Sequence, residues 1–330
     1  MALPVSAPPK PLPVSLTKWK IYCGCFLAAW AVLMFGFGLW PDVIAHWRMA
    51  LVMIFGSLVA GSTPMGGGTV AFPILVLVFG QPPASARNFG FIIQALGMTS
   101  ALIFIAGRRV PLPWKLLLGS TAGSAVGILI GNYLIGPHLA SSLVKLLFSC
   151  MWMSFGILTL LKNPEICGLK GKPPAAAMQA GFVAGLIGGT VAAMIGVGVE
   201  FAVYAVMVLI FRSDLKIAIP TAVCAAALAS ILGAALHIWI GDVGHEAFMN
   251  WMAAGPIVIF GAPTGTWLVS VLPRVRVLYF VAALCIFQFV WTLSQTAKTQ
   301  AEWMFVAGAM VVAGLTLTLL YKQGKKSVAQ

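Results

Sequence analysis

The chain has 330 residues, of which 61% are hydrophobic and only 8% are charged. Soluble domains carry about 25% charged residues, so this composition excludes a soluble enzyme, a secreted disulfide scaffold and a disordered chain. The net charge is +13, but Lys and Arg are spread thinly between apolar segments, which indicates membrane topology rather than nucleic-acid binding. The sequence therefore predicts an all-α polytopic membrane protein.

The first apolar segment follows a proline-rich stretch. Residues 1–20 are predicted to form a cytoplasmic tail, and residues 21–47 hold an additional N-terminal transmembrane helix. A spanning helix needs roughly 20 apolar residues to cross about 30 Å of hydrocarbon. Segments that meet this length are 21–40, 88–107, 114–135, 139–161, 217–240, 248–272, 277–295 and 303–321.

Two other apolar stretches, 48–80 and 175–211, are too long for one helix and are interrupted by glycines. The first interruption, 61–68, reads GSTPMGGG, and the second runs from 185 to 198. About 15 and 12 residues flank the first, giving half-helices of roughly 22 and 18 Å that are too short to cross. Both stretches are predicted to be re-entrant hairpins with tips near the midplane, where irregular backbone must be buried in protein or line a wet cavity.

Positive charge predicts the orientation, because cytoplasmic loops are enriched in Lys and Arg. The positive segments are the N-terminal tail, 108–115, 162–172, 212–216, 274–276 and 322–326. If all of them are cytoplasmic, 48–80 begins and ends outside, whereas 175–211 begins and ends inside. The prediction is a multi-pass protein of the cell inner membrane with both termini in the cytoplasm.

The two broken stretches also resemble each other. Met65-Gly66-Gly67-Gly68 aligns with Ile195-Gly196-Val197-Gly198, and an apolar half-helix follows each. The chain then divides into a transport repeat at 48–162, a cytoplasmic linker at 163–174, an inverted second repeat at 175–296, and an additional C-terminal helix with a basic tail at 297–330. Inverted repeats are typical of secondary transporters, whose binding site lies at the repeat interface. A duplicated structural scaffold without transport is the alternative.

At these motifs the chain resembles the TauE/SafE family of anion exporters, also called the sulfonate uptake permease family. The resemblance rests on Gly66-Gly67-Gly68 with Pro73, and on Arg87-Asn88-Phe89 leading into Ile93-Gln94-Ala95-Leu96-Gly97-Met98. It covers roughly residues 48–295, and the second copy departs from the pattern at Val197 and Val203. The resemblance implies a secondary transporter that moves sulfite, sulfonates or related organic anions.

An anion inside a bilayer needs hydrogen-bond donors without a large charge penalty. Half-helices beginning near Thr69 and Val199 would aim backbone N–H groups and about half a positive charge at the midplane, and glycine lets an oxyanion approach the backbone. The substrate-binding candidates are Ser62, Thr63, Gly66, Gly67, Gly68, Thr69, Asn88, Gln94, Gly196, Gly198 and Thr221, with Thr190 as a further donor. The alternatives are helix packing through small residues and, for Gln94, pairing with a neighbouring backbone group.

Glu200 is the only carboxylate well inside an apolar segment. Ionisable groups at such depth are functional by default, so Glu200 is the candidate for proton coupling. The alternative is a carboxylate that stabilises the N-terminus of its own half-helix by about 0.3–1 kcal/mol.

The exporter is favoured over several other functions. An enzyme is not expected, because GxSxG is absent and His245-Glu246 lacks the second His of HExxH. No cofactor, metal or nucleic acid is expected; the partners are a small anion, the lipid bilayer and, in one alternative, a proton, and an oligomer remains open. An anion channel, a proton-coupled uptake permease and a receptor or assembly factor are the alternatives. Export by alternating access is favoured because an inside-negative potential drives anions outward by about 2.3 kcal/mol per charge per 100 mV.

Overall fold

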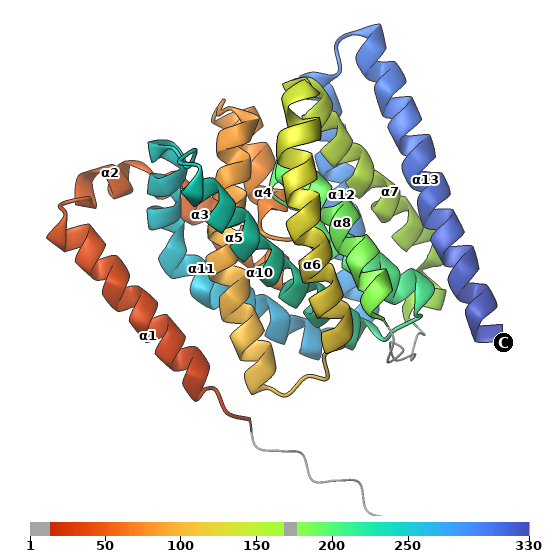
Figure 1. Ribbon diagram of the computed structural model, residues 1–330, viewed down its shortest axis with the longest axis horizontal. Coiled ribbons are helices and arrows are strands. Elements are labelled where there is room, and N and C mark those ends of the chain that lie inside the picture. Colours follow the sequence, from red (N-terminus) through yellow and green to blue (C-terminus); the bar gives the residue numbers. More distant parts are fainter. Residues whose placement is uncertain (1–13, 168–176, 330) are drawn as a thin grey trace, which may run out of the picture.

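The computed structural model describes residues 14–167 and 177–329, which form helices joined by loops without a β-strand (Figure 1). Residues 1–13 of the expected tail and 168–174 of the expected linker lie outside the described residues. The helices are α1 (Thr17–Ala31), α2 (Trp40–Ala45), α3 (Trp47–Ser62), α4 (Gly68–Pro73), α5 (Pro83–Gly107), α6 (Trp114–Ile130), α7 (Ser141–Cys167), α8 (Met178–Ile195), α9 (Val199–Ala205), α10 (Leu215–Trp239), α11 (His245–Val271), α12 (Arg274–Thr296) and α13 (Gln300–Ala329). Turns of π-helix extend α1, α4, α6 and α9 to Gly36, Val78, Ile135 and Ile210. The all-α prediction is confirmed.

Nine of the described helices are long and apolar enough to cross a membrane. Eight of them overlap the predicted spans, and the ninth is α8. Its 18 residues extend about 27 Å at the usual rise per residue, because the helix continues through Gly185, Gly188 and Gly189 to Ile195. The expected interruption from 185 onward was therefore wrong, and only residues 196–198 separate α8 from α9.

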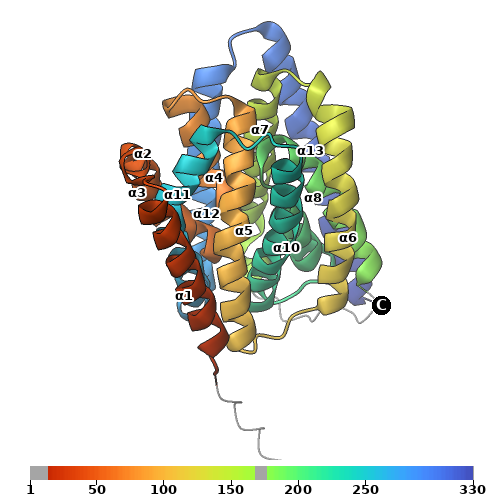
Figure 2. The ribbon, with the colours of Figure 1, turned by 60° about the vertical axis from the view of Figure 1, so that its left-hand side comes forward.

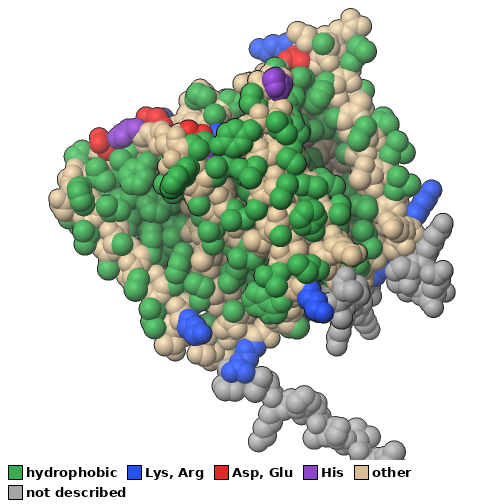
Figure 3. Space-filling model, viewed as in Figure 1, with side chains coloured by type: hydrophobic (Ala, Val, Ile, Leu, Met, Phe, Trp, Pro, Cys, Tyr) green, Lys and Arg blue, Asp and Glu red, His purple; other side chains and the backbone are tan. Residues whose placement is uncertain are grey.

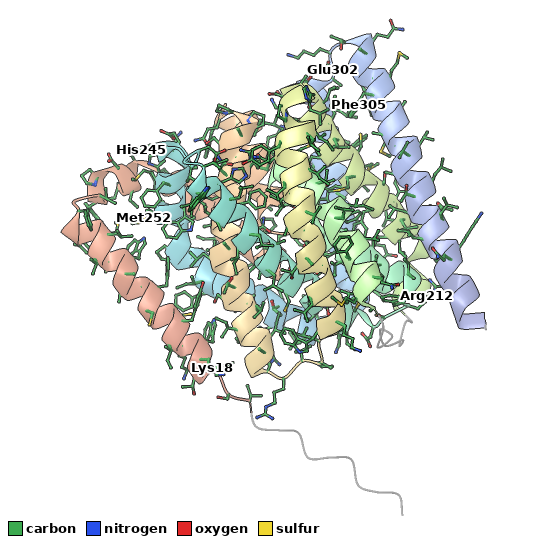
Figure 4. All side chains as sticks on the ribbon, in the orientation of Figure 1. Lys18, Arg212, His245, Met252, Glu302 and Phe305 are labelled. Carbon is green, nitrogen blue, oxygen red and sulfur yellow. The ribbon has the colours of Figure 1, made fainter. Side chains whose placement is uncertain are left out.

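Charged side chains separate toward the two ends of the bundle. Figure 4 shows His245 and Glu302 at one end, hereafter the acidic end, and Lys18 and Arg212 at the opposite end, hereafter the basic end. On the face shown in Figure 3, Asp, Glu and His side chains gather at the acidic end, and the middle of the molecule is largely hydrophobic. This distribution suits a bundle whose apolar middle lies in lipid and whose two ends face water.

α5 and α10 lie at the centre of the bundle (Figure 2). Their most apolar windows are 67% and 78% buried, whereas those of α1 and α13, at opposite edges of Figure 1, are only 11% buried. α10 is rich in alanine, and its small side chains allow close contact with α5, which also packs against α11. The central helices therefore carry the residues that can form a site away from lipid.

Glycines bring pairs of helices into backbone contact. On α6, added Cβ atoms would overlap the α8 backbone at Gly119, Gly123 and Gly127; on α8, they would overlap the α6 backbone at Gly181, Gly185 and Gly189. Because the contacts advance together along both helices, α6 and α8 run parallel. Gly61 of α3 meets Ala262 of α11 in the same way. Small residues permit this close approach in membranes, which explains why α8 keeps glycines inside a continuous helix.

The two halves of the chain share a pattern of backbone hydrogen bonds. Matching bonds are Phe79 N–H to Ile74 O and Arg108 N–H to Phe104 O in the first half, and Phe211 N–H to Val206 O and Ile240 N–H to Leu236 O in the second. α5 and α10 each have 25 residues. Each residue of the first half lies the same number of positions before its counterpart in the second half (79 and 211, 108 and 240). The same separation makes Gly198 the counterpart of Gly66, and Glu200 the counterpart of Gly68. This register is shifted by two residues from the glycine match made on sequence, which pairs Gly66 with Gly196.

Candidate functional site

Two non-helical segments interrupt helices inside the bundle: residues 63–67, hereafter the first break, and residues 196–198, the second break. Each turns at glycines of positive φ, namely Gly66 at +73°, Gly196 at +80° and Gly198 at +149°. Residues with a side chain rarely adopt this conformation. Glycine is therefore required at these three positions to reverse the chain.

The broken helices enter from opposite ends of the bundle. Glu246 follows His245 at the acidic end. Its Oε2 lies 3.3 Å from Nε2 of His46, the residue just before α3. The same oxygen lies 3.3 Å from Nε2 of Gln81, which follows α4. Arg212, which follows α9, lies at the basic end (Figure 4). The first break is thus reached from the acidic end, and the second broken segment returns to the basic end.

The two breaks are in contact. A Cβ at Gly66 would overlap Oε1 of Glu200 on α9 and would lie 2.8 Å from Oε1 of Gln94 on α5. A Cβ at Gly68 would lie 2.5 Å from Cγ1 of Val197 in the second break. Only glycine leaves room for the other break to approach at these positions.

Gln94 joins the two breaks from the central helix. Its Nε2 donates to Gly196 O at 2.8 Å and to Gly90 O at 3.3 Å. Its Oε1, like Oε1 of Glu200, is buried without a hydrogen-bond partner among the described residues. Buried acceptors without partners are costly, and both of these oxygens face Gly66. The meeting point therefore lacks a donor, which a proton on Glu200 or a bound solute could supply.

The space at the meeting point is small. A cavity of about 10 Å³ lies beside Gly67, Gln94 and Met53, which is about the size that holds one water molecule. Both breaks are buried, and this cavity is too small for a sulfite-sized anion. The conformation is closed around the breaks.

The predicted hydroxyl donors are engaged within their own segments. Thr63 Oγ1 donates to Val59 O at 2.8 Å and accepts from Met65 N–H at 3.3 Å, and Thr69 Oγ1 donates to Met65 O. The remaining hydroxyls, of Ser62, Thr190 and Thr221, donate to carbonyls three or four residues earlier. These hydroxyl groups could donate to an anion at the breaks only after their side chains rotate, so in this conformation the available donors there would be backbone N–H groups.

The structure thus brings together part of the predicted set. The meeting point of the breaks is formed by Gly66, Gly68, Gln94, Gly196 and Glu200. Gly67 lies at its edge, where an added Cβ would be 3.5 Å from Cγ of Gln94. Gly198 faces Gly188 of α8 instead. Asn88 lies six residues before Gln94 on α5, toward the acidic end. The hydroxyl group of Thr221 donates to Ile217 O within α10.

A charged network lies between the second break and the acidic end. Arg87 Nη2 donates to Asp242 Oδ2 at 3.1 Å, and Asn88 Nδ2 donates to the backbone oxygen of Asp242 at 2.8 Å. Nδ1 of His237, a fully buried residue, lies 2.9 Å from Oδ1 of Asp242, and the ring stacks on Phe91 at 5.4 Å. Asn88 is the one member of this cluster among the binding residues predicted from the sequence. For the others the sequence offered one signal, the charged side chain of Arg87 in the Arg87-Asn88-Phe89 motif.

Two larger cavities lie beside the site. One of about 560 Å³ is lined by residues such as Leu96, Phe248 and Trp251, and one of about 620 Å³ lies among α7, α8, α9 and α13. Both are lined almost entirely by apolar side chains. A small anion would lose its hydration in either without gaining donors, so the lining of neither cavity suits an anion.

The comparisons with known proteins identify the family. The family model described as sulfite exporter TauE/SafE matches residues 49–292, which contain both breaks and the charged network but not α1 or α13. None of the curated proteins or solved structures gave a match to the chain. The match and the apolar helices agree, and the chain is a multi-pass membrane protein that belongs to the TauE/SafE family of sulfite and related anion transporters.

Proposed function

We propose that the chain is a secondary transporter that exports small organic or sulfur-containing anions of the sulfite and sulfonate type. The observation that carries this proposal is the contact between two glycine breaks, of which one is reached from the acidic end and the other returns to the basic end. Interrupted helices that meet inside the membrane are characteristic of transporter binding sites. The alternating-access mechanism would open the meeting point first to one end and then to the other.

The inverted repeat is part of the proposal, with the first repeat at 48–162 and the second at 175–296. Two observations support it: the shared hydrogen-bond pattern, and the exchange of partners, in which α3 packs parallel to α11 of the second repeat and α8 packs parallel to α6 of the first. The two breaks belong to different repeats, so a movement of one repeat against the other would separate them.

The proposed orientation places the basic end, with both termini, in the cytoplasm. This follows from the retention of Lys-rich and Arg-rich segments on that side, and Lys18 and Arg212 lie there (Figure 4). An anion would enter from the basic end and leave at the acidic end. An inside-negative potential of 100 mV favours this direction by about 2.3 kcal/mol per charge.

The proposed binding groups are backbone N–H groups at the starts of the segments Gly68–Val78 and Val199–Ile210. Such helix N-termini attract anions through unpaired N–H groups and the helix dipole. Because the meeting point is closed, binding requires the breaks to separate, and the rotated hydroxyls of Thr63 and Thr69 would add donors at the first break.

The function can be tested in proteoliposomes loaded with sulfite, ethanesulfonate or a carboxylate. We expect saturable efflux and counterflow exchange for at least one sulfur oxyanion, and stimulation by a potential that is negative inside. Single-channel currents without counterflow would instead indicate a channel. No flux of any of these anions would contradict the proposal.

Glu200 supplies a second expected result. An ionised carboxylate at the meeting point would repel the anion, so we propose that the anion binds only when Glu200 is neutral. Wild-type flux of ethanesulfonate, which stays ionised, should fall as the pH rises, by about tenfold per pH unit once the carboxyl group is mostly ionised. Glu200→Gln keeps the neutral shape, and its flux should no longer depend on pH.

Glu246→Gln is the matched control, because Glu246 is an exposed carboxylate at the acidic end. It should retain the wild-type pH profile. If Glu200→Gln also retained that profile, Glu200 would not be the titrating group. Movement of lumenal pH together with ethanesulfonate would favour the alternative, a proton-coupled permease.

A further inference from the structure

Arg87 occupies an unusual position for a cation. It lies near the start of α5, within a membrane-length helix, and its side chain is only 14% exposed. A Cβ at Gly196 would lie 2.8 Å from Arg87 O, so the second break packs directly against this residue. A buried charge at such a position is expensive unless it is paired.

The guanidinium contacts both proposed repeats. Nε donates to Asn88 Oδ1 at 2.9 Å and Nη2 to Asp242 Oδ2 at 3.1 Å. Nη1 reaches Asn132 Oδ1 and Ala193 O, each at 3.4 Å, which is at the upper limit for a hydrogen bond. Asp242 and Ala193 belong to the second repeat, and Asn88 and Asn132 to the first.

The pairing of Arg87 with Asp242 is incomplete. Asp242 uses one oxygen on Arg87, and both of its oxygens lie within hydrogen-bond distance of Nδ1 of His237, at 2.9 and 3.0 Å. The two Nη atoms therefore make one hydrogen bond of ordinary length, to Asp242, and two long contacts, to Asn132 and Ala193. Guanidinium groups bind oxyanions best through two parallel hydrogen bonds, and a sulfite or sulfonate group presents several equivalent oxygens to that edge.

We propose that Arg87 is the anion-binding group on the acidic-end side of the breaks, and that the transported oxyanion replaces Asp242 in the ion pair. This assignment rests on the proposed function. The exchange keeps the buried guanidinium paired both with and without substrate. It also releases the side chain of Asp242 from Arg87, which is one of the contacts that hold the loop 241–244 between α10 and α11, beside the bond from Asn88 to Asp242 O.

The two readings of this ion pair predict opposite effects of Asp242→Asn. If Asp242 competes with the anion, removing its charge should tighten binding of ethanesulfonate by about tenfold. If the pair only ties the helices together, the loss should leave anion binding unchanged or weaker. Kd is obtained from the ethanesulfonate dependence of the melting temperature of the full chain in detergent.

Arg87→Lys is the second variant. Lys keeps the charge but cannot form two parallel hydrogen bonds, so Kd should rise about tenfold while the anion-free protein stays folded. Glu246→Gln, at the same end but away from Arg87, should leave Kd unchanged.

An unchanged or weaker affinity in Asp242→Asn, or a wild-type affinity in Arg87→Lys, would overturn the assignment of Arg87 even if the wild-type protein transports ethanesulfonate. A wild-type protein that neither binds nor moves sulfite or sulfonates would overturn the proposed function and this assignment together.

Discussion

Gly66→Ala is expected to reduce anion flux at least tenfold while leaving most of the protein folded. Alanine at the φ of +73° costs about 1–2 kcal/mol, and its methyl group would occupy the position now taken by Oε1 of Glu200. That oxygen belongs to the end of a side chain, which can move, so the cost falls on the geometry of the meeting point rather than on the core. Flux in proteoliposomes and melting temperature in detergent measure the two effects separately.

Gly67→Ala is the matched control. The added Cβ would lie 3.5 Å from Cγ of Gln94 and 3.6 Å from Cβ of Ala60, which are ordinary van der Waals contacts. Although Gly67 belongs to the same glycine triplet, we expect near wild-type flux. Wild-type flux in both variants would contradict a role of the first break in transport.

A large loss of stability is expected for Gly185→Ala in the interface between α8 and α6. An added Cβ would overlap Ser120 O and lie 2.8 Å from Ser120 Cα. Backbone atoms cannot move aside as a side-chain end can, so the two helices must separate. Overpacking of this kind costs about 1–3 kcal/mol, and the melting temperature in detergent should fall accordingly.

Gly308→Ala serves as the control for this substitution. Gly308 lies in α13, where nothing would come within 4 Å of an added Cβ, and alanine favours a helix more than glycine does. Its melting temperature should equal or exceed that of the wild-type protein. A Gly185→Ala protein as stable as Gly308→Ala would contradict the close backbone contact between α6 and α8.

The sequence alone determined the membrane class, eight of the nine described helices of spanning length and the location of the first break. These features are local: apolar length sets a span, and Pro64 with three consecutive glycines ends a helix wherever it lies. The same rule predicted that a helix ends at Gly185, Gly188 and Gly189, but these glycines lie inside α8. A glycine that ends a helix and one that packs against a facing helix look alike in sequence, and the presence of α6 decides between them.

Only the tertiary structure decided which side chains meet. Gln94 reaches Gly196 across 102 residues, and Arg87 reaches Asp242 across 155; no spacing rule relates residues so far apart. Glu200 was recognised as a buried carboxylate from its neighbours in the chain, but its place opposite Gly66 depends on how two broken helices approach each other. The packing of α5, a helix of the first proposed repeat, against both breaks sets that approach.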